Sequence, residues 1–173
     1  VEGVWRRVAL GTDSLGEPVG AALLVAVGVA GCLAVRWWRA AVLLVAGTGV
    51  AVGVTKVLKP LVGRTIYEAN LAYPSGHTAF LTAFAVVVAL LVAGRVGFGK
   101  TAGTSVVLAA GLLAGTAMGW AQVALGAHYP TDTLGGMCTA FAVVPATAWL
   151  VDRVAEARRR DPGGVKRGGG RRV

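Results

Sequence analysis

Five long apolar segments dominate the sequence and leave few folds open to it. Each has close to the roughly 20 residues that an α-helix needs to cross a lipid bilayer. Four of them contain no acid or base, and the second contains only Lys56, near its end. With 55% apolar and 14% charged residues, the chain has too little amphipathic surface to bury these helices in a soluble protein. We therefore expect an all-α fold, a multi-span transmembrane helix bundle, with spans at residues 18–35, 40–58, 77–94, 104–127 and 133–151.

The net charge of +9 is divided unequally between the two ends of these spans. One end collects 12 of the 17 Lys and Arg residues against three acids, and the other end carries five bases and five acids. The positive-inside rule assigns the basic end to the cytoplasm. We therefore expect a multi-pass protein of the cell membrane with a cytoplasmic C-terminus and an opposite, extracytoplasmic end.

This orientation divides the chain into three parts. Residues 1–17 are too polar to cross and form an extracytoplasmic lead-in segment, residues 18–151 form the transmembrane domain, and residues 152–173 form a basic cytoplasmic tail. The tail lacks interleaved aromatic side chains, so nucleic acid is not an expected partner. Its bases suit anionic membrane lipid instead.

Polar side chains gather in three short segments, all at the extracytoplasmic ends of the predicted spans. The segments are 59–64 (KPLVGR), 74–77 (PSGH) and 128–132 (HYPTD). Both histidines of the chain are among them. The sequence therefore predicts one polar site at this end of the bundle.

Four of these residues are suited to binding phosphate. Ser75 and Gly76 stand where a helix begins, so free backbone N–H groups and the positive end of the helix dipole favour an anion there. Lys59 and Arg64 add permanent positive charge. A tetrahedral phosphate is the expected guest.

The two histidines are suited to the chemistry of phosphoryl transfer. His128 and Asp132 are four residues apart, and Pro130 favours a helix start between them. Asp132 can then reach back to one imidazole nitrogen of His128 and leave the other free to attack phosphorus. His77 is available to protonate the departing alkoxide.

In this order, at successive span ends, the three segments resemble the three signature motifs of the type 2 phosphatidic acid phosphatase (PAP2) family. The resemblance covers the chain from the first apolar run to residue 151. It implies a PAP2-like core of six membrane helices with an extracytoplasmic active site, so an intact protein would carry one span more than the five found here. It also implies chemistry without a metal ion or cofactor.

Carried over position by position, the resemblance also implies roles for individual residues. His128 would be the nucleophile that forms a phosphohistidine, oriented by Asp132, and His77 would be the general acid. The phosphoryl oxygens would be bound by Lys59, Ser75 and the Gly76 amide.

Two positions depart from the family pattern. The family usually places an arginine seven residues after the lysine, where this chain has Ile66, and another six residues before the nucleophile, where it has Gln122. Arg64 could replace the first, whereas Gln122 can donate a hydrogen bond but carries no charge. One donor to the transition state is worth roughly 3–4 kcal/mol, so a lost arginine weakens charge stabilisation in the transition state.

The expected function is that of a membrane lipid phosphatase. Its substrate would be a lipid phosphomonoester or pyrophosphate, and the resemblance implies polyprenyl (pyro)phosphate, phosphatidic acid or phosphatidylglycerol phosphate. Two alternatives remain open at this stage. Ile66 and Gln122 would also fit a catalytically weak relative that binds or carries a lipid phosphate, and the same phosphohistidine could serve a phosphotransferase.

Overall fold

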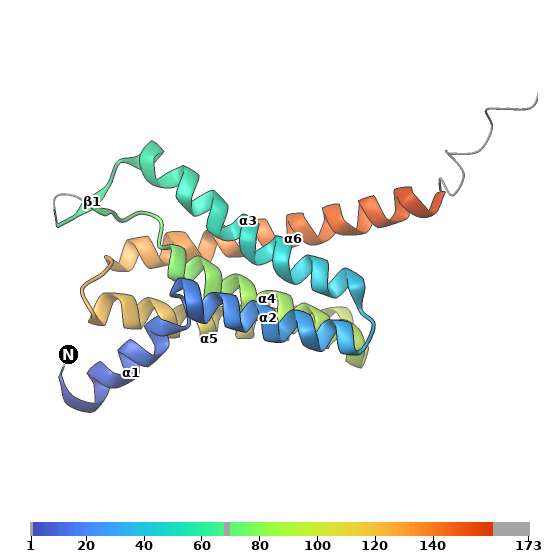
Figure 1. Cartoon of the computed structure of the whole chain (residues 1–173), viewed down its shortest axis with the longest axis horizontal. Helices are drawn as coiled ribbons and strands as arrows, with labels where there is room; N and C mark the ends of the chain where they lie inside the picture. The colour runs from blue at the N-terminus through green and yellow to red at the C-terminus, as the bar shows by residue number, and fades with distance from the viewer. Residues whose placement is uncertain (1, 68–69, 161–173) are drawn as a thin grey trace, which may run out of the picture.

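Residues 2–67 and 70–160, which the computed structural model describes, form six helices and one very short strand pair (Figure 1). The helices are α1 (Gly3–Ser14), α2 (Pro18–Ala34), α3 (Trp38–Val62), α4 (Gly76–Val96), α5 (Lys100–Ala124) and α6 (Pro130–Arg160). The strands β1 (Thr65–Ile66) and β2 (Asn70–Leu71) pair antiparallel in the connection between α3 and α4. The all-α fold expected from the sequence is confirmed.

Four helices, α3 to α6, are long and apolar enough to cross a membrane. The segment predicted as the first span forms α2, whose 17 residues extend about 25 Å, less than the roughly 30 Å hydrocarbon core of a bilayer. It reaches the length of a span only together with α1, from which it is bent by 60°. The protein is a multi-pass membrane protein with four such helices, or five if the bent pair is counted as one span.

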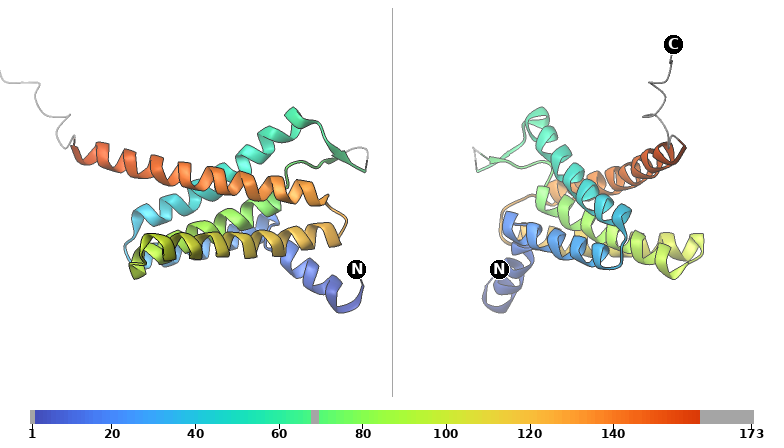
Figure 2. Two further views of the ribbon diagram at one scale, coloured as in Figure 1. Left: turned by 180° about the vertical axis from the view of Figure 1, so that it is seen from behind. Right: turned by 45° about the vertical axis from the view of Figure 1, so that its right-hand side comes forward.

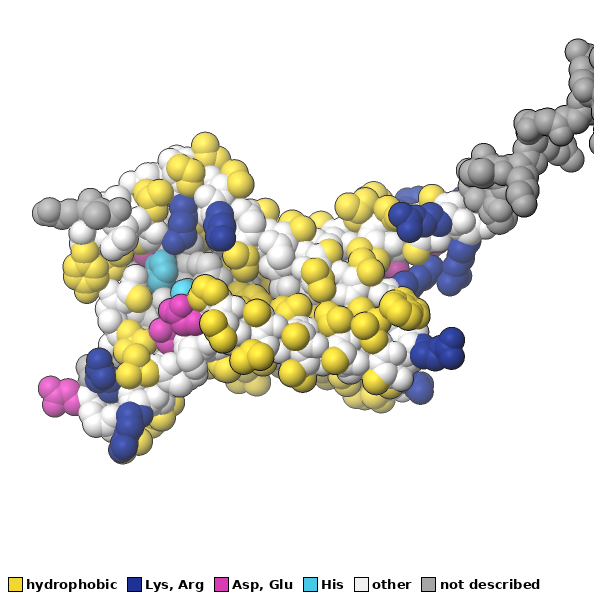
Figure 3. Space-filling model, in the orientation of Figure 1, with side chains coloured by type: hydrophobic (Ala, Val, Ile, Leu, Met, Phe, Trp, Pro, Cys, Tyr) yellow, Lys and Arg dark blue, Asp and Glu magenta, His cyan; other side chains and the backbone are white. Residues whose placement is uncertain are grey.

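The centre of the bundle is α4, which packs against α3, α5 and α6. Its core is formed by small and medium apolar side chains such as Leu44, Val86 and Val144. Apolar side chains also cover the outside of the helices, as Figure 3 shows, and α2 buries none of its residues. This surface is suited to contact with lipid.

Close packing of α5 depends on small residues at every fourth position. A Cβ on Gly111 would lie 2.6 Å from the Phe141 ring, and one on Gly115 would lie 2.7 Å from Met137. Such stripes of small residues allow transmembrane helices to approach each other closely. They hold α5 against α6, and the connection between these two helices carries part of the polar site.

Three connections meet at one end of the bundle: the α1–α2 bend, the described parts of the α3–α4 connection with the strands β1 and β2, and the α5–α6 turn (Figures 1 and 2). The α2–α3 and α4–α5 turns lie at the opposite end. The segment predicted as a tail begins inside α6, which continues as a helix to Arg160, whereas residues 161–173 lie outside the described part of the chain. All three polar segments of the sequence therefore lie at the same end.

Candidate active site

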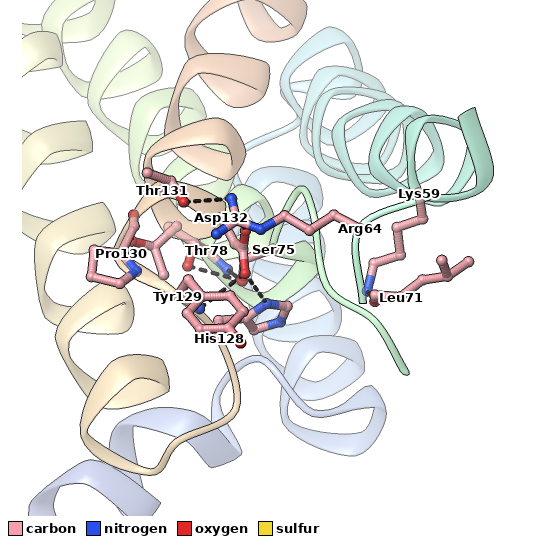
Figure 4. Close-up of polar contacts among 11 residues, drawn as sticks. Lys59, Arg64, Leu71, Ser75, Thr78, His128, Tyr129, Pro130, Thr131 and Asp132 are labelled. Atoms are coloured by element: carbon pink, nitrogen blue, oxygen red, sulfur yellow. Dashed lines mark hydrogen bonds and ion pairs between the residues drawn. The ribbon is translucent and has the colours of Figure 1, made fainter. Parts of the chain in front are cut away.

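His128 faces a buried carboxylate at the start of α6. Asp132 lies in the first turn of this helix with no exposed surface. Its Oδ2 accepts the backbone N–H of Tyr129 at 2.9 Å and lies 3.6 Å from Nδ1 of His128 (Figure 4). With Nδ1 facing the carboxylate, Nε2 is the nitrogen left for a substrate. The two groups face each other, as the four-residue spacing indicates, at a distance longer than a hydrogen bond, and the orienting role of Asp132 remains a prediction.

The His128 ring is largely buried, with 10% of its side chain exposed. Burial lowers its pKa below the usual 6.5, the positive charge of Lys59 lowers it further, and Asp132 acts in the opposite direction. The ring is therefore neutral at neutral pH. A neutral imidazole is the form that can act as a nucleophile.

Arg64 is anchored to the same aspartate. Its guanidinium lies 3.2 Å from Oδ1 of Asp132, donates a hydrogen bond to Thr131 Oγ1 at 2.7 Å and lies 4.8 Å from the centre of the Tyr129 ring (Figure 4). These contacts involve one edge of a group with five N–H donors. Arg64 thus lies beside the histidine–aspartate pair, where its other donors can serve a phosphate.

Lys59 projects from the last turn of α3 toward the strand pair. Its Nζ donates a hydrogen bond to the carbonyl oxygen of Leu71 at 2.8 Å, and Figure 4 shows Lys59 extending toward Leu71 and Arg64 extending toward Asp132. An ammonium group has three donors, so two remain for a ligand. The helix ends two residues beyond Pro60, where Gly63 takes a left-handed conformation with φ 66°.

Ser75 is the N-cap of α4, as expected from the sequence. Its buried Oγ accepts hydrogen bonds from the N–H of Thr78 at 3.3 Å and from the Thr78 hydroxyl at 3.1 Å. Its backbone N–H donates to the carbonyl oxygen of Asp132 at 2.9 Å, which joins α4 to α6. Gly76 is the first residue of α4 and is half-buried. Phosphate binding by Ser75 and Gly76 remains a prediction.

His77 faces two acids that the sequence had not indicated. Its Nε2 lies 3.8 Å from Oδ1 of Asp13 and 3.6 Å from Oε1 of Glu17, both in or beside the α1–α2 bend. A Cβ on Gly16 would lie only 2.4 Å from Cδ2 of His77, so the bend approaches the ring closely because this residue is glycine. Figure 3 shows histidine side chains in a hollow between basic and acidic groups.

Residues 40–156 match the PAP2 superfamily. The chain belongs to this superfamily. Its structure is similar to the crystal structure of the first transmembrane PAP2 type phosphatidylglycerolphosphate phosphatase from Bacillus subtilis, with a TM-score of 0.67 and 25% sequence identity. The likeness covers 93% of this chain and 82% of that chain. No curated protein matched the sequence.

The PAP2 match includes the three polar segments but excludes α1, the α1–α2 bend and α2, and therefore also Asp13 of α1 and Glu17 of the bend. Both acids lie in residues 1–17, which the sequence predicts as a polar lead-in segment and not as part of the site. The composition could have indicated them, since the chain has only eight acids and these two lie close to the start of the first apolar run.

Gln122, one of the two departures from the PAP2 pattern, has a definite partner. It is 2% exposed on α5 and donates its side-chain amide to Oδ1 of Asp13. The other departure, Ile66, lies in β1. Arg64, two residues before Ile66, occupies the site through its contact with Asp132. The two absent arginines therefore have different structural consequences.

Asp13, Glu17 and His77 are also a set that could hold a metal ion, since their ligand atoms lie within 4.8 Å of one another. A cation bound there would take the Nε2 lone pair of His77. It would therefore compete with any proton carried by that atom.

Proposed function

We propose that the protein hydrolyses a phosphomonoester or pyrophosphate of a membrane lipid through a phosphohistidine on His128. PAP2 membership supports a membrane lipid phosphatase. The observation that carries the residue assignment is the largely buried His128 ring, which faces the buried Asp132 carboxylate, with Arg64 beside the same carboxylate. The lowered pKa of His128 supports a neutral ring. Phosphatidylglycerol phosphate, the substrate named for the similar Bacillus subtilis enzyme, is the first candidate, with phosphatidic acid and polyprenyl (pyro)phosphate as the others.

In the first step, Nε2 of His128 attacks phosphorus and forms a P–N bond. The P–O bond to the lipid breaks, and its electron pair leaves with the lipid oxygen, which takes a proton from His77. Asp132 stabilises the positive charge that develops on the His128 ring. Lys59 and Arg64 stabilise the negative charge on the phosphoryl oxygens.

In the second step, water attacks phosphorus and the P–N bond breaks, which releases inorganic phosphate and restores neutral His128. By microscopic reversibility, His77, now without its extra proton, accepts the proton of the attacking water. Every proton lost in one step is regained in the other. The cycle uses only side chains of this chain and water.

The acids at the α1–α2 bend define which nitrogen of His77 performs this transfer. Carboxylates only accept hydrogen bonds, so Nε2, which faces Asp13 and Glu17, keeps its proton. Nδ1 is then the nitrogen that protonates the lipid oxygen. We assign Asp13 and Glu17 as positioning residues that act through His77.

The charge distribution supports an extracytoplasmic location for this chemistry. The end of the bundle with the site carries equal numbers of acids and bases, and the opposite end carries the excess of positive charge. We therefore propose that the enzyme acts on lipids of the outer leaflet.

Phosphate release by purified protein tests the proposal. His128→Ala should reduce turnover of all three candidate lipids by about 10³-fold or more, because it removes the nucleophile. Cys138→Ala, at an exposed position on α6, is the matched control and should leave turnover unchanged. Unchanged turnover in His128→Ala would exclude the mechanism.

A second candidate function is the binding of lipid phosphate without hydrolysis. Gln122 favours it, because an uncharged residue stands where the family pattern has an arginine. Retention of a candidate lipid by the native chain with no phosphate release would support that function. A phosphotransferase would instead move the phosphoryl group to an added acceptor alcohol, which product analysis detects.

A further inference from the structure

A basic cavity lies at the end of the bundle remote from the candidate active site. It has a volume of about 640 Å³, and Arg36, Arg39 and Arg95 line it together with Trp37 and Trp38. None of the residues that line it is an acid. The α2–α3 turn and the end of α4, which form this cavity, meet at the right-hand end of Figure 1, where Figure 3 shows basic side chains.

The three arginines in this cavity keep their charge available. The guanidinium of Arg95 lies 5.5 Å from the centre of the Trp37 ring, which fixes its direction without neutralising it. Arg39 lies 3.9 Å from Asp152, but the two side chains are 46% and 67% exposed, so this ion pair is weak. Arg36 occupies the left-handed backbone region with φ 60° in the tight turn between α2 and α3.

Two apolar grooves adjoin this basic cavity. One, of about 300 Å³, shares Trp37 and Arg95 with it and runs along α2 and α4 past Gly31. The other, of about 250 Å³, shares Arg39 and Leu90 with it, lies between α3, α4 and α6, and is lined by Asp152 in addition to its apolar residues. The arrangement is one basic pocket with two adjoining grooves whose linings are mostly apolar.

We infer that this end of the protein binds one anionic diacyl phospholipid. Its phosphate lies among the three guanidinium groups, which recognise phosphate oxygens through charge-assisted hydrogen bonds. Its two acyl chains follow the two grooves, and the tryptophans lie at the level of the headgroup. Basic pockets between transmembrane helices bind anionic lipid headgroups in this manner.

A second copy of this chain does not fit the same surface. A twofold contact would place this patch against its own copy and bring six arginines together without an acid in the lining. Like charges at such short distances are repulsive. The pocket is also separate from the candidate active site, so its occupation by lipid does not depend on the proposed function.

Native mass spectrometry of the full chain in detergent, titrated with dioleoyl phosphatidylglycerol or dioleoyl phosphatidylcholine, tests the inference. Phosphatidylglycerol is a phosphodiester and shares its acyl chains with the zwitterionic control. The native chain should retain phosphatidylglycerol about tenfold more tightly, and Arg36→Gln with Arg95→Gln should abolish this preference. The matched control, the double variant Arg6→Gln with Arg7→Gln, removes the same charge from α1. It should change the preference for phosphatidylglycerol by no more than about twofold.

Groove filling provides a second test that keeps all charges. A Cβ on Gly31 meets no atom within 4 Å, so Gly31→Leu should occupy the first groove without disturbing the bundle and should weaken lipid retention. Gly49 lies at an equally open position on α3 outside the grooves, so Gly49→Leu should leave lipid retention unchanged. Equal retention of both lipids by the native chain, equal losses in the two arginine pairs, or a dimer in place of the lipid adduct would overturn the inference.

Discussion

Replacing Asp13 by Asn changes the charge beside His77 while keeping the shape of the side chain. The amide oxygen of asparagine can still accept the hydrogen bond from Gln122. Two unit charges 4 Å apart at an effective dielectric constant of 20 interact by about 4 kcal/mol. The side chains of Asp13 and His77 are 22% and 28% exposed and 3.8 Å apart, and Glu17 remains at 3.6 Å. We therefore expect the variant to lose only about 1 kcal/mol of transition-state stabilisation, which lowers kcat roughly fivefold.

The assay compares two leaving groups. An alkyl lipid phosphate needs a proton on its departing oxygen, whereas 4-nitrophenyl phosphate releases a stable phenolate that leaves without one. Asp13→Asn should therefore slow the lipid substrate about fivefold and leave the aryl substrate nearly unchanged. His77→Ala should show the same selectivity with a loss of about 10²–10⁴ on the lipid.

Equal losses on the two substrates would refute this reasoning, because they would show that Asp13 supports the fold and has no effect on proton transfer. The absence of any loss in Asp13→Asn would refute it as well. A native chain that hydrolyses neither substrate would instead count against the proposed function, so the two failures can be distinguished. Thermal unfolding of the variant reports separately on the fold.

Three further predictions concern the same site. Asp132→Asn should reduce kcat, measured by phosphate release, by about 10³–10⁴. The two carboxylate oxygens face Arg64 and Nδ1 of His128. An amide has only one such oxygen, so the His128 ring takes the wrong tautomer. Activity should fall as the pH decreases through a His128 pKa below 6.5, and Lys59→Gln should move this acid limb of the kcat/KM profile to higher pH, because it removes one cause of the lowered pKa. Gly16→Ala should lower stability by about 1–3 kcal/mol in thermal unfolding, since its Cβ would overlap the His77 ring. Gly11→Ala is its control, because a Cβ there meets nothing within 4 Å.

The bundle could be predicted from the sequence because a bilayer requires a long apolar run for every helix that crosses it. The same requirement places polar segments at span ends, so three such segments at one face indicated one site. The first apolar run was also predictable, since α2 begins at Pro18 as expected and has 17 residues, one fewer than the predicted span 18–35. The 60° bend that joins α2 to α1 was not indicated by the apolar pattern.

The contact between the α1–α2 bend and His77 could not be predicted from sequence spacing. It joins residues 64 and 60 positions apart, and it depends on α1 packing against α5, where the rings of Trp5 and Trp120 meet edge-on with centroids 6.1 Å apart. Nothing in a local pattern specifies such a tertiary contact. Arg64 illustrates the same limit, because its residue type indicated phosphate but not its anchor on Asp132.

Gln122 connects these observations. An arginine at this position would lie against Asp13 and neutralise the carboxylate that faces His77, because a buried pair of opposite charges cancels at short range. Glutamine instead holds Asp13 through an uncharged amide and leaves its negative charge directed at the histidine. Under the proposed mechanism, Gln122 therefore preserves a negative charge beside the proton donor His77. Gln122 and Asp13 are best understood as one unit that acts on His77, so exchanging either of them should alter proton transfer to the lipid oxygen.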